Sequence, residues 1–204
     1  MANDWSKHPF PPNRHVHFSP LRRVQQRKDS DGVAHQILVQ TEEMSCGPAA
    51  VAILISLCRH QPLGTAADMR LKTVAARFAG SMAEQDEKWK SQGPNSGHQG
   101  SYLANIENVL VHEHIPIAAS WHRWQEKSST AVVAQGRVHH SPALLLWGWY
   151  EQSQRVGGHF TVAARVTRAG KVVILDPWDG SLAEIAAGAL YKGSGMLDAA
   201  IYTG

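Results

Sequence analysis

One cysteine is placed where its thiol could act as a nucleophile. Cys46 lies in the stretch QTEEMSCGPAAVAILISL, where Gly47-Pro48 and then an apolar run follow it. Proline suits the first turn of a helix, so we expect a helix to begin here and to run to about Arg59. The partial positive charge and backbone N–H groups of a helix N-terminus favour a thiolate and can stabilise an oxyanion. Gln40, six residues upstream (46 − 40 = 6), could supply a second, side-chain donor to that oxyanion.

A thiol nucleophile needs a base, and His159 is the best placed of the 12 histidines. It follows Gly157-Gly158, which would let another backbone come close, and it starts the apolar strand pattern HFTVAARV. Asp176 ends the next strand pattern, KVVILDP, 17 residues later (176 − 159 = 17). A hairpin that turns near Gly170 would bring both side chains to the same open end. There the carboxylate could fix the tautomer of the imidazole.

The elements that must position these residues are helices first and strands second. Helical patterns cover residues 46–59, 63–80 and 102–115, the last with Ser101 as its N-cap. Strand patterns cover residues 33–40, 115–120, 142–150, 159–166 and 171–177. Because side chains alternate along a strand, we expect His159 to share a face with Thr161 and Ala163. We therefore expect an α+β fold in which the helices pack on an antiparallel sheet.

The bulk composition fits one core-forming domain. The chain has 204 residues, of which 43% are hydrophobic and 18% charged. We assign residues 31–204 to that domain and residues 1–30 to a basic, Pro- and His-rich arm that we expect to be flexible. The formal net charge is +3, but no nucleic-acid-binding motif follows the arm, so nucleic acid is not an expected partner. We expect substrate specificity to lie in the loop 81–100 and the segment 120–140.

The two cysteines and the absence of long apolar runs bear on location. Two thiols are too few for a disulfide scaffold and fit a reducing compartment. Cys58, in the middle of apolar company, we interpret as structural. The longest apolar run is too short to span a membrane, and no secretory signal is visible. We expect a cytoplasmic protein in the producing cell, with export by a route that needs no such signal left open.

Three motifs in a fixed order resemble those of papain-like cysteine peptidases. They are Q-x5-C-G-P-A, G-G-H-F-T-V and I-L-D-P-W-D-G. The resemblance covers residues 35–185 and is, in particular, to the bacterial C39-type peptidases that process bacteriocins and to the C39-like or AvrRpt2-like effector proteases. It implies a papain-like fold with the cysteine at the start of the central helix. It also implies the roles: Cys46 as nucleophile, His159 as general base and acid, Asp176 as its orienter, and Gln40 as an oxyanion-hole donor.

The same resemblance implies a cysteine peptidase that cleaves a specific protein. It further implies a secreted bacterial effector or toxin, with a protein or peptide substrate and a cognate immunity or inhibitor protein as partners. Processing of leader peptides is an alternative, although those peptidases are usually fused to a transporter and carry an acidic residue where this chain has Ser45. A transglutaminase- or deamidase-type acyl transferase is a second alternative, and a catalytically silent papain-like binding module is a third.

Several residues also have plainer interpretations. Asp176 could form a turn before proline, Gln40 could be a solvated loop residue, and Trp178 could shield the triad or belong to the core. The pairs His15-x-His17 and His112-x-His114 could suggest a metal. Two histidines at i and i+2 do not share a helix face, however, and no further ligands complete either set. We expect neither a metal nor a cofactor.

Overall fold

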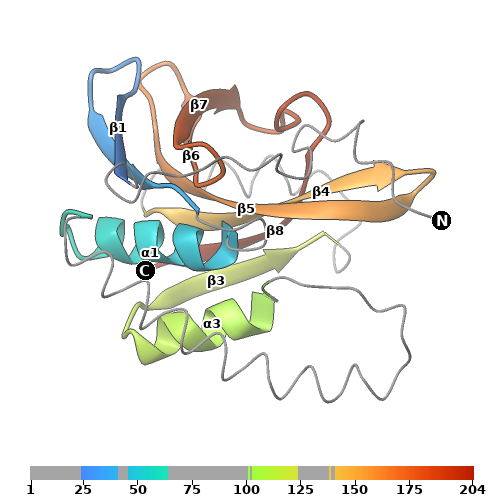
Figure 1. Ribbon diagram of the computed structural model, residues 1–204, viewed down its shortest axis with the longest axis horizontal. Helices are drawn as coiled ribbons and strands as arrows, with labels where there is room; N and C mark the ends of the chain where they lie inside the picture. The colour runs from blue at the N-terminus through green and yellow to red at the C-terminus, as the bar shows by residue number, and fades with distance from the viewer. Residues whose placement is uncertain (1–23, 41–45, 64–100, 102, 124–137, 139–140) are drawn as a thin grey trace.

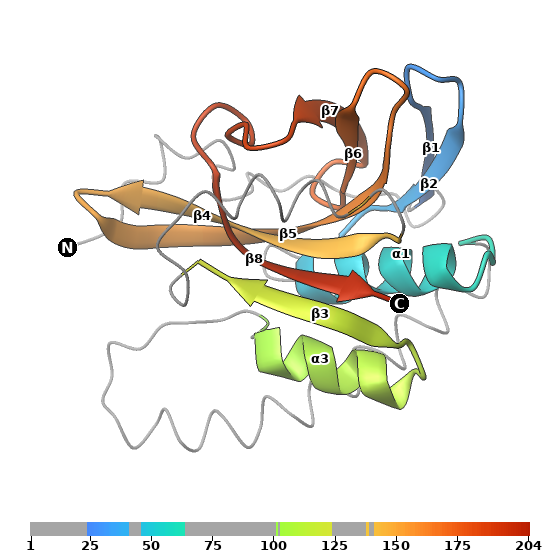
Figure 2. The same cartoon turned by 180° about the vertical axis from the view of Figure 1, so that it is seen from behind.

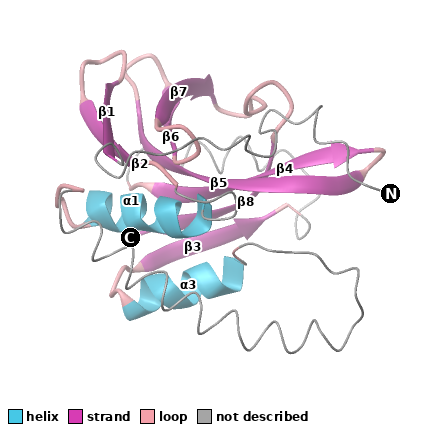
Figure 3. Cartoon of the chain, in the orientation of Figure 1, coloured by secondary structure: helices cyan, strands magenta, loops and turns pink. Residues whose placement is uncertain are grey.

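The computed structural model describes residues 24–40, 46–63, 101, 103–123, 138 and 141–204, which form helices packed on antiparallel strands (Figure 1, Figure 3). The two helices in this part of the chain are α1 (Cys46–Cys58) and α3 (Leu103–His112). The strands are β1 (Val24–Lys28), β2 (Ala34–Leu38), β3 (Ile117–His122), β4 (Ala143–Glu151), β5 (Gln154–Val166), β6 (Lys171–Asp176), β7 (Ser181–Ala186) and β8 (Met196–Thr203). The expected α+β class is confirmed.

The strands form two antiparallel sheets. Six of them lie in the order β3-β8-β4-β5-β6-β7, so β8 lies between β3 and β4 although it comes last of the strands. Strands β1 and β2 form a separate two-stranded sheet beside β6 and β7 (Figure 2). Helix α1 packs against β5 and β2, and α3 packs against α1 and β3 (Figure 1).

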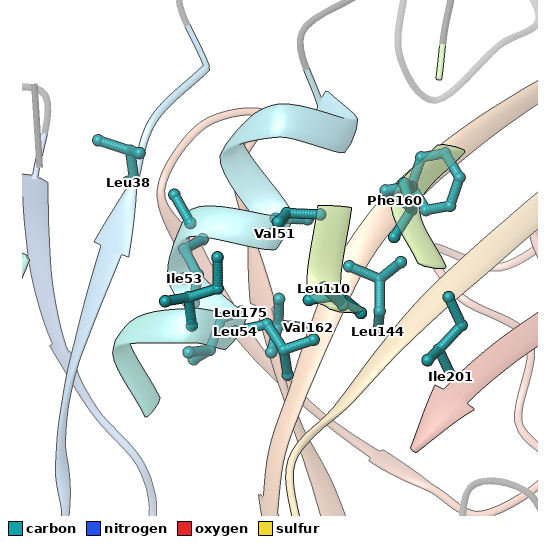
Figure 4. Close-up of a cluster of buried hydrophobic side chains, with 14 of the residues drawn as sticks. Leu38, Val51, Ile53, Leu54, Leu110, Leu144, Phe160, Val162, Leu175 and Ile201 are labelled. Carbon is teal, nitrogen blue, oxygen red and sulfur yellow. The ribbon is translucent and has the colours of Figure 1, made fainter. Parts of the chain in front are cut away.

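Helix α1 is buried on all sides. Every residue from Ala49 to Ile55 is at most 2% exposed. Figure 4 shows its apolar side chains among those of the neighbouring elements, with Val51, Ile53 and Leu54 beside Leu38, Leu110, Val162 and Leu175. A helix that is apolar all round belongs in a core, which confirms the expectation for this run. Because the helix is fixed in this way, its first turn has a fixed place too.

Strands β5 and β6 form the expected hairpin. The backbone N–H of Thr167 donates to the carbonyl of Lys171 at 2.8 Å, and Gly170 has a φ of 76°. This left-handed conformation favours glycine, which explains the position of the turn. The first register pair between the two strands on the side away from the turn is Val162 with Leu175. The ends of β5 and β6 away from the turn therefore lie together.

The six-stranded sheet has an apolar core on each face. Phe160 and Val162 belong to the core that contains α1, whereas Ala163 belongs to a second core with Trp147 and Tyr191. The alternation expected along β5 is thus confirmed. Because successive side chains alternate, His159 faces the second core. Phe160 and Val162, on the opposite face of β5, belong to the core that contains α1.

The N-terminal arm was assigned too many residues. Val24–Lys28, which we expected to lie in a flexible arm, form strand β1 and pair with β2 over five register positions. The strand carries the polar sequence VQQRK, so its pairing depends on backbone hydrogen bonds and on a neighbour, which no side-chain pattern reveals. Residues 1–23, residues 64–80 of the helix expected over 63–80, the loop 81–100 and residues 124–137 lie outside the described residues.

Candidate active site

Cys46 is the first residue of α1, and its thiol lies at the edge of β5. The sulfur accepts hydrogen bonds from the backbone of Phe160 and of Gly47. Strand β6 begins to pair with β5 only at Val162, so Phe160 lies beyond the paired part of β5. Its backbone can therefore bind the thiol instead of a neighbouring strand. A side chain at Gly47 would overlap Ser101, so glycine lets the first turn lie this close to its neighbours. Backbone donors from the helix and the strand thus hold the sulfur from two sides.

His159 and Asp176 form a buried pair next to this thiol. Nε2 of His159 lies 2.7 Å from Oδ1 of Asp176, and the two residues are 3% and 0% exposed. A side-chain hydrogen bond joins His159 to Cys46. Because the carboxylate takes Nε2, the imidazole turns Nδ1 to the thiol. The structure thus brings together the three residues that the sequence predicts, in one chain of thiol, imidazole and carboxylate.

The charges of this group favour a thiolate beside an imidazolium. Burial by itself would raise the pKa of Cys46, but the hydrogen bond and charge of His159, followed by the two backbone donors, hold that pKa below its ordinary value. Burial would likewise lower the pKa of His159, but the charge of Asp176, and then the hydrogen bonds to Asp176 and Cys46, raise it to about 9. Both shifts favour a proton on the imidazole rather than on the sulfur.

Asp176 is held by more groups than the sequence predicts. Its Oδ1 accepts the backbone N–H of Trp178 at 2.8 Å, and its Oδ2 accepts the hydroxyl of Tyr191 at 2.5 Å. Nζ of Lys192 lies 2.9 Å from the same Oδ2. Burial raises the pKa of Asp176, but the charges and donors around it, first His159 and then Lys192, bring it well below its usual range. Tyr191 and Lys192 were missed because no spacing rule links a turn residue to a strand end 15 residues earlier (191 − 176 = 15).

Gln40 and Trp178 lie around the ends of β2 and β6. The backbone N–H of Gln40 donates to the carbonyl of Pro177 at 2.7 Å, so Gln40 lies beside the turn that follows Asp176. The residue is 2% exposed, which excludes the interpretation as a solvated loop residue. The ring of Trp178 meets that of His159 edge-on, with centroids 6.1 Å apart and planes at 86°. The indole thus covers one side of the imidazole.

Cys58, at the other end of α1, behaves in the opposite way. Burial raises the pKa of its thiol, and a hydrogen bond with Thr203 and the charge of Arg59 offset this only in part. Both cysteines are free thiols. The two ends of one helix therefore carry one thiol that favours the ionised form and one that favours the protonated form. The structural interpretation of Cys58 agrees with this difference.

A second buried carboxylate lies on the opposite face of the β4–β5 hairpin. Asp198 of β8 is 0% exposed; its Oδ1 accepts the hydroxyl of Tyr150 at 2.6 Å and its Oδ2 binds Nε of Arg155 at 2.8 Å. Nη1 of Arg123 lies 3.8 Å from Oδ1 of Asp198. The guanidinium of Arg155 occupies the place that a side chain at Gly158 would take. Gly158 therefore makes room for a side chain, whereas we expected it to admit a backbone.

The described residues show neither a metal-binding cluster nor a membrane span. No group of three or more His, Cys, Asp or Glu side chains is placed to hold an ion within these ranges. His112 and His114 are described, whereas His15, His17 and the pair at 139–140 lie outside. No described helix is both long enough and apolar enough to cross a bilayer.

Comparisons with known proteins add no relative. No protein-family model matches the chain, and a search of curated proteins gives no match. The interpretation of the site therefore depends on its geometry and on the motifs that the sequence contains.

Proposed function

We propose that the protein is a papain-like cysteine peptidase that cleaves a specific protein substrate. The observation that carries the proposal is the chain from Cys46 through His159 to Asp176, in which the carboxylate holds Nε2 and leaves Nδ1 for the thiol. The order of the residues, the position of Cys46 at the start of a buried helix and the strands that carry His159 and Asp176 support a papain-like fold. The cover of Trp178 on the imidazole supports it as well.

Acylation would start from the thiolate and imidazolium pair. The sulfur of Cys46 attacks the carbonyl carbon of a peptide bond, and a C–S bond forms while the carbonyl oxygen becomes an oxyanion. The backbone N–H of Cys46 and the side-chain amide of Gln40 are the proposed donors to that oxyanion. Nδ1–H of His159 gives its proton to the amide nitrogen, the C–N bond breaks, and the amine leaves. The product is a thioester on Cys46.

Deacylation would return the pair to its first state. Neutral His159 takes a proton from water at Nδ1, and the hydroxide adds to the thioester carbon. The C–S bond breaks and releases the acid, which leaves a thiolate beside an imidazolium. Asp176 keeps Nε2–H in place throughout, so the ring has one orientation in both steps.

The motifs also support a biological setting. By the resemblance, the protein is a bacterial effector or toxin that is made in the cytoplasm, exported without a general secretory signal, and checked by an immunity protein. The basic segment around residues 14–28 is available to acidic partners by its composition. Neither the substrate nor the partner has a recognisable code in the described residues.

The test compares wild type with Cys46→Ala and with Cys58→Ala, which removes the other thiol of the same helix. Each form is expressed in bacterial cells, and new protein N-termini are identified by mass spectrometry. We expect a defined set of cleavages in wild type and in Cys58→Ala, and none in Cys46→Ala. Labelling with a thiol-reactive peptide should modify Cys46 in preference to Cys58.

Other outcomes separate the alternatives. Cleavages that persist in Cys46→Ala would contradict the proposal. A small mass increase on glutamine side chains, without new N-termini, would instead indicate a deamidase or transglutaminase. Equal, slow labelling of both cysteines and no change in any protein would indicate a silent binding module.

A further inference from the structure

Two residues outside all the sequence motifs bind Oδ2 of Asp176, the carboxylate oxygen that His159 does not bind. We propose that Tyr191 and Lys192 are positioning residues, which hold Asp176 and set the pH range over which Cys46 and His159 remain an ion pair. This inference rests on the proposed function, because it assigns a role within the same site. Both residues come from the turn between β7 and β8, and both bind the carboxylate of Asp176.

The geometry divides the carboxylate into two halves. Oδ1 of Asp176 receives His159 at 2.7 Å and the backbone N–H of Trp178 at 2.8 Å. Oδ2 receives the hydroxyl of Tyr191 at 2.5 Å and Nζ of Lys192 at 2.9 Å. A carboxylate bound at both oxygens by four donors has one orientation, so the imidazole that it holds has one orientation too.

Tyr191 is a rigid part of this arrangement. It is 0% exposed, and its ring stacks on Trp147 with centroids 4.9 Å apart. Nε1 of Trp147 donates in turn to the hydroxyl of Thr161 on β5, two residues from His159. Burial, followed by the charge of Asp176, raises the pKa of the Tyr191 hydroxyl above its ordinary value, so the hydroxyl stays a donor.

Lys192 is held in an unusual backbone conformation. Its φ is 44°, in the left-handed region where a residue with a side chain is strained, and the neighbouring Gly193 has a φ of 81°. The turn is closed by hydrogen bonds in both directions between Tyr191 and Gly195, at 2.8 and 2.7 Å. Glycine would be the less strained residue at position 192, yet the chain has a lysine whose ammonium reaches Asp176. Strain of this kind, next to a candidate site, points to a role for the side chain.

The charge of Lys192 acts on the whole site in one direction. The groups that face Asp176 are His159 from β5 and Tyr191 and Lys192 from the turn. Lys192 also faces Asp179, whose Oδ2 is 3.9 Å from Nζ of Lys192. His159 faces Asp176 on one side and Cys46 on the other. The ammonium of Lys192 and the imidazolium of His159 are both attracted to the negative charge of Asp176. Without the ammonium, the carboxylate would attract the imidazolium proton more strongly, and the ion pair would last to higher pH.

The experiment follows alkylation of Cys46 by iodoacetamide from pH 4 to pH 11, with the modified site identified by mass spectrometry. The rate profile has a lower limb, where the thiolate forms, and an upper limb, where His159 loses its proton. We expect Lys192→Met to move the upper limb to higher pH, by on the order of one unit for the loss of one nearby charge. Lys192→Arg keeps the charge and should restore the wild-type profile. Lys171→Met, at the exposed start of β6, is the matched control and should change nothing.

Tyr191→Phe keeps the ring and removes only the hydroxyl. It should move the upper limb in the same direction by a smaller amount, and it provides a second test if Lys192→Met does not fold. An upper limb unchanged in the folded variants would overturn the inference while leaving the peptidase proposal in place. If wild-type Cys46 itself reacts at pH 6 no faster than Cys58, there is no ion pair, and both proposals fail. A shift that Lys192→Arg does not reverse would likewise overturn the role of the charge.

Discussion

Asp176 and Asp198 are two buried carboxylates with almost the same surroundings and different consequences. Each is 0% exposed, and each accepts a tyrosine hydroxyl and binds a cation. The third partner differs. Asp176 binds His159, whose imidazole can take and give a proton, whereas Asp198 binds the guanidinium groups of Arg155 and Arg123, a kind of group that does not do so in proteins.

The two networks also lie on opposite faces of one hairpin. In β5, Gly158 lies beside the guanidinium of Arg155, which binds Asp198, and the next residue, His159, binds Asp176. One residue along the strand therefore separates the Arg155–Asp198 network from the network that contains the thiol. Burial and a cation are enough to fix a carboxylate, whereas chemistry needs a titratable partner that reaches a nucleophile.

The largest effect is expected from removal of that titratable partner. His159→Ala should slow alkylation of Cys46 at pH 6 by on the order of 100-fold, because an ordinary thiol with a pKa of about 8.5 is only roughly 0.3% ionised there. Arg155→Ala, the corresponding change in the other network, should leave the rate within about twofold. The rates are measured with iodoacetamide on folded protein, and a large loss in Arg155→Ala would show that the two networks are not separate.

The Asp198 network should instead determine stability. Asp198→Ala leaves Tyr150 and Arg155 without their buried acceptor, and we expect the free energy of unfolding to fall by about 2 kcal/mol. The arginines are 41% exposed and can return to water, which keeps the loss below that of a fully buried pair. Urea unfolding measures the change, and the alkylation rate per folded molecule should stay at the wild-type value. An unchanged midpoint would contradict the structural role.

The pH dependence of stability tests whether the thiolate and the imidazolium coexist. The pKa of His159 is raised to about 9, so its contribution is complete below about 6.5 and is lost as the pH rises to about 9. The pKa of Cys46 is lowered, so its contribution has the opposite sign and grows over the same range, towards the ordinary thiol value. In wild type the two should nearly cancel, and the free energy of unfolding should be almost flat between pH 7 and 9.

Cys46→Ala removes the contribution of the thiol to the free energy of unfolding and leaves that of His159. Its free energy of unfolding should fall across the window, by about 1–2 kcal/mol, since one pKa unit corresponds to about 1.4 kcal/mol. Urea unfolding at pH 7, 8 and 9 provides the measurement, with Cys58→Ala as the control that should follow wild type. Parallel curves for wild type and Cys46→Ala would mean that the folded protein holds an un-ionised thiol.

The smallest effect is expected at the residue between the two networks. In Gly158→Ala the new Cβ meets the end of the flexible Arg155 side chain, which can move aside. We expect a loss of less than about 1 kcal/mol in unfolding free energy from the disturbed Arg155–Asp198 bond. Alkylation of Cys46 should not change. A large drop in alkylation would mean that the two faces of the hairpin are coupled through the backbone of β5.

The sequence predicts the centre of the site because each part has a strong local pattern. Gly47-Pro48 before an apolar run defines the start of α1, and the alternating HFTVAARV with the turn at Gly170 defines the β5–β6 hairpin. Once these elements are correct, the pairing of His159 with Asp176 follows from the direction of the strands. These residues are the ones for which local and tertiary preferences agree.

The parts that were missed depend on contacts between distant segments. Strand β8 contains Asp198 in its sequence MLDAAIYT, and an aspartate in a run with two alanines does not resemble a buried strand. Strand β7, SLAEIA, has residues that also suit a helix. Tyr191 and Lys192 lie in a Gly-rich turn, where only the folded chain shows that the tyrosine is buried and the lysine reaches a carboxylate.

The place of β8 in the sheet has a consequence for the time at which the site forms. A ribosome that has just added Cys46 must add 157 more residues before β8 ends at Thr203 (203 − 46 = 157) and can join β3 to β4. At about 5–20 residues per second, this takes on the order of 10–30 s. Until His159 and Asp176 have been added, Cys46 has no imidazole and carboxylate beside it, so we expect it to react as an ordinary thiol. Ribosome-bound chains that stop before Asp176 should therefore be alkylated slowly at pH 6, at the rate of an ordinary thiol.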